Sequence, residues 1–189
     1  MMLKTLDIDI DYNLITQEYK KLEVDRLLNE ANHLKQIAIQ CRKETSATDQ
    51  LYESCGSLFF DWTKYDGNGE VPLREDRIDE TDITETCDYF VGSYFEDIIE
   101  KIKLKYGYQL YRGRFLKSLH KTCLTYHTDP SPRLHIPIYT NENCMMIVND
   151  NVIRLPFGNT YVVDTTLPHT ALNASKYTRV HLVFCLDKF

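Results

Sequence analysis

The sequence places two histidines and an aspartate in a pattern that suits a metal centre. His127 and Asp129 are separated by one residue, and His169 follows a proline further along the chain. On a strand, alternate side chains point to the same face, so His127 and Asp129 can project together from one strand end. Two neutral imidazoles and one carboxylate hold iron(II) on one side and leave its other positions open, unlike a closed four-ligand zinc site. The pattern therefore predicts that His127, Asp129 and His169 bind iron(II).

An arginine completes this set of candidate residues. Arg179 opens the run Arg-Val-His-Leu-Val-Phe, whose alternation predicts a strand with the arginine on the same face as His181. An arginine that points into a barrel is costly unless an anion pairs with it, and a dicarboxylate co-substrate offers such an anion. The combination predicts an iron(II) oxygenase that uses 2-oxoglutarate and O₂ as co-substrates.

Each of these features also has a simpler explanation. A histidine and an aspartate two residues apart can be a solvated turn histidine beside an aspartate that caps a helix or turn. Arg179 can be a rim residue paired with an ordinary acid. A β-rich half that carries a further histidine and a strand-borne arginine favours the metal site over these explanations.

The C-terminal half has the pattern of a small β domain. Short runs of β-branched and aromatic residues follow Gly107 and are separated by Asn, Asp, Gly and Pro, which predicts many short antiparallel strands. We therefore expect a mainly β fold, a double-stranded β-helix (jelly roll, cupin-like) over residues 108–189, with helices packed outside it. The expected strands are 108–119, 123–126, 133–139, 144–148, 152–155, 160–163 and 179–186.

Residues 1–107 are expected to form a helical and mixed region that packs on this barrel. Apolar residues at spacings of three and four predict a helix over 16–33, with Asn13 or Thr16 as the N-cap. The next apolar residues alternate with polar ones, which predicts a strand over 36–40.

A less regular stretch follows in the same region. Residues 61–88 combine turn sequences with an acidic run, which has seven carboxylates and two arginines from Arg74 to Asp88, and they predict a mobile loop. The acidic run can be a solvated face or a lid that attracts a basic substrate. Beyond it, we expect a helix to resume by Tyr89, and the interleaved apolar and lysine residues from Phe95 to Lys105 predict that it is amphipathic and ends at Gly107.

Composition sets limits on partners and compartment. The 189 residues suit one domain, and the net charge of −6 disfavours a nucleic-acid partner, which usually demands a basic face. The six cysteines are scattered without a C-x-x-C pair, which argues against a zinc site and disulfides. No apolar run approaches the length of a membrane span, and the N-terminus lacks the core of a signal peptide. We therefore expect a cytoplasmic protein without membrane contact.

From Arg114 to Phe184 the chain resembles the aspartyl/asparaginyl β-hydroxylase family of 2-oxoglutarate oxygenases, including its smaller proline-hydroxylase-like members. The matching motifs occur in the order in which the family has them. They are 127–129 (His-Thr-Asp), 133–138 (Arg-Leu-His-Ile-Pro-Ile), 158–164 (Gly-Asn-Thr-Tyr-Val-Val-Asp), 168–173 (Pro-His-Thr-Ala-Leu-Asn) and 179–184 (Arg-Val-His-Leu-Val-Phe).

The resemblance implies roles for the residues at matching positions. His127, Asp129 and His169 would ligate iron. Arg179 would hold the distal carboxylate of 2-oxoglutarate. Some members of the family lack the carboxylate ligand, whereas this chain has one in Asp129.

Further residues would complete the co-substrate site by the same resemblance. Arg133 and His135 match an Arg-x-His pair that contacts the co-substrate or an acidic group of the substrate. The family's second anchor for 2-oxoglutarate is a hydroxyl on the strand before the first histidine. No single position matches it here, and Ser118 and Tyr161 are the candidates.

These observations predict an enzyme that couples oxidative decarboxylation of 2-oxoglutarate to hydroxylation of an unactivated C–H bond of an amino acid, free or within a peptide or protein. The alternatives are an oxygenase that acts on a nucleobase or another small metabolite, and a non-oxidative cupin-type metal protein. A cupin-type protein has no need for a co-substrate anchor at Arg179. A basic stretch that includes Arg112 and Arg114 can hold a substrate carboxylate or only offset nearby acids. The substrate and the oligomeric state stay open.

Overall fold

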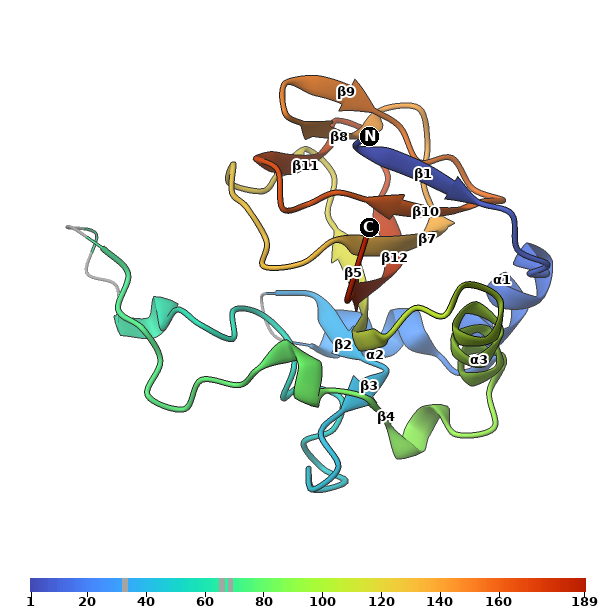
Figure 1. Cartoon of the computed structure of the whole chain (residues 1–189), viewed down its shortest axis with the longest axis horizontal. Coiled ribbons are helices and arrows are strands. Elements are labelled where there is room, and N and C mark those ends of the chain that lie inside the picture. Colours follow the sequence, from blue (N-terminus) through green and yellow to red (C-terminus); the bar gives the residue numbers. More distant parts are fainter. Residues whose placement is uncertain (32–33, 65–66, 68–69) are drawn as a thin grey trace.

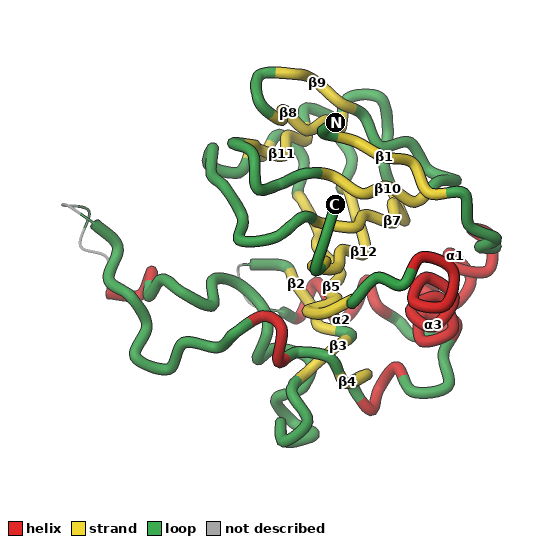
Figure 2. Tube along the Cα trace, in the orientation of Figure 1, coloured by secondary structure: helices red, strands yellow, loops and turns green. Residues whose placement is uncertain are grey.

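The structure is a computed structural model that describes residues 1–31, 34–64, 67 and 70–189. Most of its strands form two antiparallel sheets that pack against each other, and a separate two-stranded sheet and the three α-helices lie to one side (Figures 1 and 2). In order across the larger sheet, the strands are β1 (Leu3–Leu6), β10 (Thr160–Val163), β7 (Arg133–Tyr139), β12 (Arg179–Leu186), β5 (Leu110–Ser118) and β2 (Gln36–Ala38). Across the smaller sheet they are β6 (Thr122–Cys123), β11 (His169–Asn173), β8 (Cys144–Val148) and β9 (Asn151–Ile153).

This arrangement is a double-stranded β-helix with helices outside it, which confirms the predicted fold class. Strands β7, β8, β10 and β12 have the bounds that the sequence predicts. Strand β11 was not predicted, because its sequence His-Thr-Ala-Leu-Asn contains neither a β-branched apolar run nor a clear alternation. It is held by pairing with β8 and β6, which is tertiary information.

The N-terminal helices begin and end differently from the prediction. The expected helix over 16–33 is two helices, α1 (Tyr12–Lys21) and α2 (Val24–Glu30), separated where Glu23 takes a left-handed conformation (φ 47°). The N-cap of α1 is Asp11, whose carboxylate accepts hydrogen bonds from the backbone N–H groups of the next turn. Residues 32–33 lie outside the described residues.

The third helix ends where the sequence predicts but begins later than the expected Tyr89, because Asp88–Phe90 form a separate 3₁₀ turn. α3 (Tyr94–Tyr106) ends at Gly107, which takes the left-handed conformation (φ 63°) that favours glycine at this position. The expected strand over 36–40 is divided between β2 and the short β3 (Gln40–Cys41). Within the described residues, no helix combines the length and the apolarity that crossing a bilayer requires.

The helices cover one face of the larger sheet and bury its apolar side chains. Phe115 of β5 makes edge-to-face contacts with Phe95 of α3 and Tyr19 of α1, with ring centroids 5.0 and 5.7 Å apart. Alternation in the strands then directs the other residues of β7 and β12, including His135 and Arg179, to the opposite face. That face lines the interior between the two sheets, so the polar candidates of the sequence meet inside the barrel.

The N-terminal region contributes to the sheet as well as to its helical cover. β1 pairs with β10, and β2 pairs with β5, so residues before Gly107 supply both edges of the larger sheet. The division of the chain at residues 107 and 108 stays a prediction about domain organisation.

The segment expected as a mobile loop contains short ordered elements. They include η1 (Trp62–Lys64), η2 (Glu80–Asp82) and β4 (Glu85–Thr86), which pairs with β3, and η3 (Asp88–Phe90) follows. Much of the segment between β3 and η2 extends away from the sheets, at the left of Figure 1. Residues 65–66 and 68–69 lie outside the described residues. The end of the segment returns to the sheet, where the Arg112 N–H donates to the carbonyl of Ile83 at 2.8 Å.

Gly113 lets β5 approach its neighbours closely, and its replacement tests this packing. A Cβ atom at Gly113 would lie 2.5 Å from Cε1 of Phe184 and 2.9 Å from Cγ1 of Ile39. We expect Gly113→Ala to lower the free energy of unfolding by about 1–3 kcal/mol, because overpacking displaces buried side chains. Urea denaturation measures this change. Adding Phe184→Leu should make the alanine less costly than it is alone, and equal costs in both backgrounds would contradict the proposed clash.

Candidate metal centre

Three side chains that the sequence singles out converge at one end of the barrel. The potential ligand atoms of His127, Asp129 and His169 all lie within 4.8 Å of one another. Nε2 of His127 is 4.0 Å from Oδ1 of Asp129, and Nε2 of His169 is 3.6 Å from Oδ2 of the same carboxylate. His127 and Asp129 come from the loop between β6 and β7, and His169 is the first residue of β11. Residues distant in sequence thus form one cluster.

A backbone bridge brings the two histidines together. The His127 N–H donates to the His169 carbonyl at 3.0 Å, and the His169 N–H donates to the His127 carbonyl at 2.8 Å. Residues that exchange both hydrogen bonds lie directly opposite each other, and here the two imidazole centroids are 4.4 Å apart. The Asp129 N–H donates to the carbonyl of Thr165 at 2.9 Å, which fixes the aspartate beside them.

Both imidazoles are oriented so that Nε2 is available to a metal. Nδ1 of His127 lies 2.7 Å from the carbonyl of Thr125, and Nδ1 of His169 lies 3.0 Å from the carbonyl of Leu167. A carbonyl only accepts, so each Nδ1 carries the hydrogen and each Nε2 keeps its lone pair. Burial lowers the pKa of His169, which favours the neutral form that a metal requires.

The cluster fits a metal ion with an open coordination face. Two imidazole nitrogens and one carboxylate approach from one side, and the side chains of His127 and Asp129 are partly exposed. Such a set suits iron(II) with free positions for other ligands. A solvated turn histidine beside a capping aspartate would not explain why His169 joins the same cluster with its Nε2 directed at Asp129.

The Arg133 side chain supports the carboxylate ligand. Its Nε donates to Oδ2 of Asp129 at 3.0 Å, and its two terminal nitrogens donate to the two carboxylate oxygens of Glu80 at 3.1 and 3.2 Å. This differs from the expectation that Arg133 contacts the co-substrate or the substrate. The physical reason is Glu80, a buried acid that takes up the end of the guanidinium group.

Glu80 is the residue of this site that sequence analysis missed. It lies in the acidic run between Arg74 and Asp88, which has the composition of a solvated face. The signal available in the sequence was weak: Ile78 and Ile83 flank Glu80, and the structure buries Ile83 completely.

A second polar group lies deeper in the barrel around Arg179. Its Nε donates to Nε2 of His181 at 3.1 Å, and Nδ1 of His181 is 3.5 Å from Nδ1 of His135. Nη2 of Arg179 also lies 3.1 Å from Nδ1 of His181, so the guanidinium contacts both ring nitrogens of that histidine. Within the described residues, Nε2 of His135 is buried and has no hydrogen-bond partner.

The charge of Arg179 is not balanced by an acid. Among the described residues, no carboxylate lies within ion-pair distance of it, and burial lowers its pKa to about 10. Burial is the main reason why the pKa of His135 lies well below its usual value, and nearby positive groups, Arg179 first, lower it further. His135 belongs to the polar group around Arg179, which it reaches through His181.

The structure separates the two candidate hydroxyl anchors. Ser118 of β5 is the register partner of Arg179 of β12, so both side chains point to the same face of the sheet. The Tyr161 hydroxyl instead donates to the carbonyl of Pro156 at 3.0 Å. The geometry therefore favours Ser118 over Tyr161 as the hydroxyl beside Arg179.

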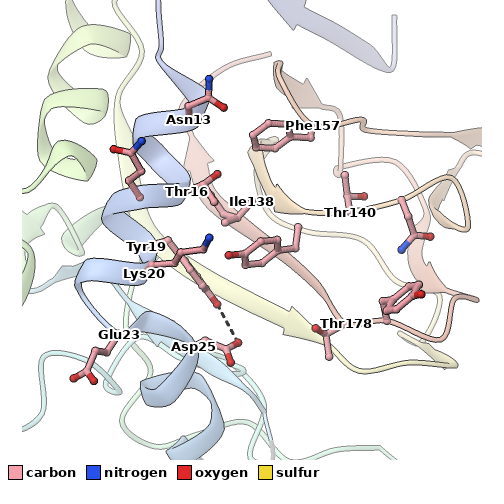
Figure 3. A pocket seen from close by; sticks show the side chains of 14 residues that line it. Asn13, Thr16, Tyr19, Lys20, Glu23, Asp25, Ile138, Thr140, Phe157 and Thr178 are labelled. Carbon is pink, nitrogen blue, oxygen red and sulfur yellow. Dashed lines mark hydrogen bonds between the residues drawn. The ribbon is translucent and has the colours of Figure 1, made fainter.

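A broad open cavity of about 1300 Å³ lies elsewhere, between α1 and the ends of β7 and β12 (Figure 3). No residue of the metal cluster lines it. Thr140 lines this cavity and also lies near Arg179 and His181. The side chains labelled in Figure 3 include Asn13, Thr16, Tyr19, Lys20, Ile138, Thr140, Phe157 and Thr178.

Comparisons with known proteins agree with this geometry. Residues 12–188 match the family model described as Aspartyl/Asparaginyl beta-hydroxylase. L-proline cis-4-hydroxylase from Rhizobium meliloti (strain 1021) is 29% identical over 76 residues, a match that covers 37% of this chain and only 27% of that protein.

One solved structure with a TM-score above 0.5 shares the fold over most of this chain at low sequence identity. AviO1 from Streptomyces viridochromogenes Tue57 superposes with a TM-score of 0.51 at 13% identity, over 98% of this chain and 89% of that one. An oxidoreductase of the 2OG-Fe(II) oxygenase family from Burkholderia pseudomallei has a TM-score of 0.39 at 14% identity, over 46% of this chain and 50% of that one.

Replacement of His169 tests the cluster directly. We expect His169→Ala to lose stoichiometric iron(II) binding, because the variant lacks one of three ligand atoms and the remaining two leave the ion weakly held. Anaerobic iron(II) titration measures this loss. His120→Ala, which alters an exposed histidine between β5 and β6, should bind iron as wild type does. Normal iron stoichiometry in His169→Ala would show that the cluster is not the metal site.

Proposed function

From its membership of the aspartyl/asparaginyl β-hydroxylase family, to which this chain belongs, we propose that the protein is an iron(II)- and 2-oxoglutarate-dependent dioxygenase. It hydroxylates an unactivated C–H bond of an amino acid, free or within a peptide or protein. The observation that carries the proposal is that the same barrel holds the His127–Asp129–His169 cluster and a buried arginine, Arg179. Among the described residues, no carboxylate forms an ion pair with that arginine.

Three residues would hold the iron. Nε2 of His127, Nε2 of His169 and one oxygen of Asp129 would occupy one side of the ion. The iron, once bound, would supply the chemistry by which O₂, 2-oxoglutarate and the substrate R–H are converted to succinate, CO₂ and the hydroxylated product R–OH. The carbonyl oxygens of Thr125 and Leu167 hold the two rings in the required tautomer throughout.

Other residues would bind and orient 2-oxoglutarate. The Arg179 guanidinium would form the bidentate pair with the distal carboxylate, with the Ser118 hydroxyl beside it. Nε2 of His135, which has no partner among the described residues, would contact the same molecule. Because Arg179 and His135 are buried, the pair with the carboxylate would form away from water, where a charge-assisted hydrogen bond is strongest.

One relative supports an amino acid as the substrate, but it does not specify which amino acid this protein takes. The partial match to a protein named for hydroxylation of L-proline supports an amino acid as substrate. The net charge of −6 counts against a nucleic acid. A non-oxidative cupin-type protein is less well supported, because it would leave the buried charge of Arg179 without a partner.

The proposal is tested by anaerobic titration of the iron(II)-loaded protein with 2-oxoglutarate. Chelation of iron by the keto acid should produce a visible metal-to-ligand charge-transfer band in the wild type. His127→Ala should give no band, because it lacks a ligand. A wild-type protein that binds iron and shows no band would contradict the proposal and favour a cupin-type function.

A second prediction concerns the co-substrate anchor. Arg179→Ala should retain iron and bind 2-oxoglutarate roughly 100-fold more weakly, since breaking a buried charge pair costs about 3 kcal/mol or more. Titration of the charge-transfer band measures this affinity. Arg154→Ala, which removes an exposed arginine of the same barrel, is the matched control and should bind normally. An unchanged affinity in Arg179→Ala would show that the anchor lies elsewhere.

A further inference from the structure

Glu80 lies at the centre of a buried network of charges. Only 3% of its surface is exposed, although it belongs to the acidic segment that leads into β4. One carboxylate oxygen accepts hydrogen bonds from the Ser131 hydroxyl at 2.8 Å and from Arg133 at 3.1 Å. The other accepts from Arg133 at 3.2 Å and from Arg112 at 3.3 Å. Both oxygens are therefore fully engaged.

The network alternates in charge and ends on a candidate metal ligand. Arg112 contacts Glu80, Glu80 contacts Arg133, and Arg133 contacts Asp129. Two cations and two anions balance, which lets all four groups be buried or nearly so. Burial alone would raise the pKa of Glu80, but the adjacent Arg133 and Arg112 lower it to about 2, so Glu80 is an anion at neutral pH.

The far end of the network is anchored to the backbone. The Arg112 side chain donates to the carbonyls of Ser54, at 3.2 Å, and Gly56. These hydrogen bonds fix the Arg112 side chain to the backbone. Glu80 therefore has an anchored arginine, Arg112, on one side and contacts Arg133 on the other.

We propose that Glu80 is a positioning residue for the metal centre, which acts through Arg133 on Asp129. This inference rests on the proposed function. The bidentate pair with Glu80 fixes the plane of the Arg133 guanidinium, and that plane directs Nε to Oδ2 of Asp129. The orientation of the carboxylate toward the two Nε2 atoms therefore depends on an acid that itself touches no ligand.

Glu80 also determines how strongly Arg133 competes with a metal ion. An uncompensated guanidinium beside Asp129 would draw electron density from the carboxylate and repel a divalent cation. With Glu80 in place, the charge of Arg133 is shared between two anions, and Asp129 keeps its capacity to bind a metal. Partners of this kind are commonly as important to a metal site as the ligands themselves.

The same contact connects the irregular segment to the site. Ser131, which donates to Glu80, lies two residues after Asp129, and its carbonyl accepts from the Thr165 hydroxyl at 2.9 Å. Thr165 in turn accepts the N–H of Asp129. These hydrogen bonds pack the η2 segment against the loop that carries Asp129.

The test is the affinity of the folded, metal-free protein for cobalt(II), measured anaerobically by the visible absorption of the bound ion. Glu80→Gln keeps the size of the side chain and removes its charge. We expect this variant to bind cobalt(II) roughly 10–100-fold more weakly than wild type. Asp82→Asn is the matched control, because it removes an exposed carboxylate from the same η2 helix. It should bind cobalt(II) as wild type does.

A double-mutant cycle with Arg133→Met separates positioning from general stability. Since Glu80 acts through Arg133, Glu80→Gln should change cobalt(II) affinity little once Arg133 is absent. A stability effect without a positioning role would lower the unfolding temperature and leave cobalt(II) affinity unchanged, and that result would overturn the inference. Equal losses of affinity in the presence and absence of Arg133 would also overturn it.

A second variant keeps the test decisive if Glu80→Gln does not fold. Arg133→Lys retains the positive charge but cannot bridge Glu80 and Asp129 with a planar fork, so it should also weaken cobalt(II) binding. Wild-type affinity in Arg133→Lys would overturn the inference. A wild-type protein that takes up no divalent metal would contradict the proposed function and the inference together, whereas normal binding by both wild type and Glu80→Gln would contradict the inference alone.

Discussion

Buried positive charge is the constraint on which the arrangement of this site depends. A buried guanidinium is costly unless an anion or several acceptors compensate it. Glu80 and Asp129 form ion pairs with two of the buried arginines, whereas no acid in the described part of the chain lies within ion-pair distance of the other two. The paired arginines support the metal cluster, and Arg179 remains as a cation that an acidic co-substrate can neutralise. The four buried arginines are Arg112, Arg114, Arg133 and Arg179.

Burial of the apolar face of the larger sheet offsets the free-energy cost of the polar interior. Phe115, Leu182 and Phe184 are completely buried beneath the helices, and burial of such side chains contributes about 1.5–3 kcal/mol each. The opposite face of the same strands can then carry histidines and arginines. A smaller apolar cluster, which includes Val148 of β8 and Val163 of β10, joins the two sheets. The side chains that stabilise the fold and the polar side chains of the candidate site thus lie on opposite faces of the larger sheet.

The residues of the candidate metal cluster are held partly by backbone hydrogen bonds and partly by a side chain. The backbone bridge between His127 and His169 joins a loop to the first residue of β11, and each imidazole is held by a carbonyl two residues before it. The ligand geometry therefore comes from main-chain hydrogen bonds, which are rigid. Asp129 differs, because its side chain is held by Arg133, and through it by Glu80. Of the three candidate ligands, Asp129 is therefore connected to the irregular acidic segment, which lies within the residues that match the family.

Much of this protein could be predicted from local pattern. The strands that became β7, β8, β10 and β12 were recognisable because a side-chain period of two and β-branched residues are local properties. The helix break at Glu23 and the strand that begins at His169 were not, since backbone conformation and pairing there depend on distant neighbours.

The sequence by itself determined the chemistry available to the site, because two histidines, one carboxylate and a strand-borne arginine limit which ligands can bind. From the sequence we expected His127 and Asp129 at one strand end, whereas both lie in the loop between β6 and β7. Only the tertiary structure decided which buried charges are paired. Arg133 meets Glu80 across 53 residues of chain, and Ser118 rather than Tyr161 lies opposite Arg179. Such pairings depend on strand register and on where a loop returns to the sheet, and no local spacing of residues encodes either one.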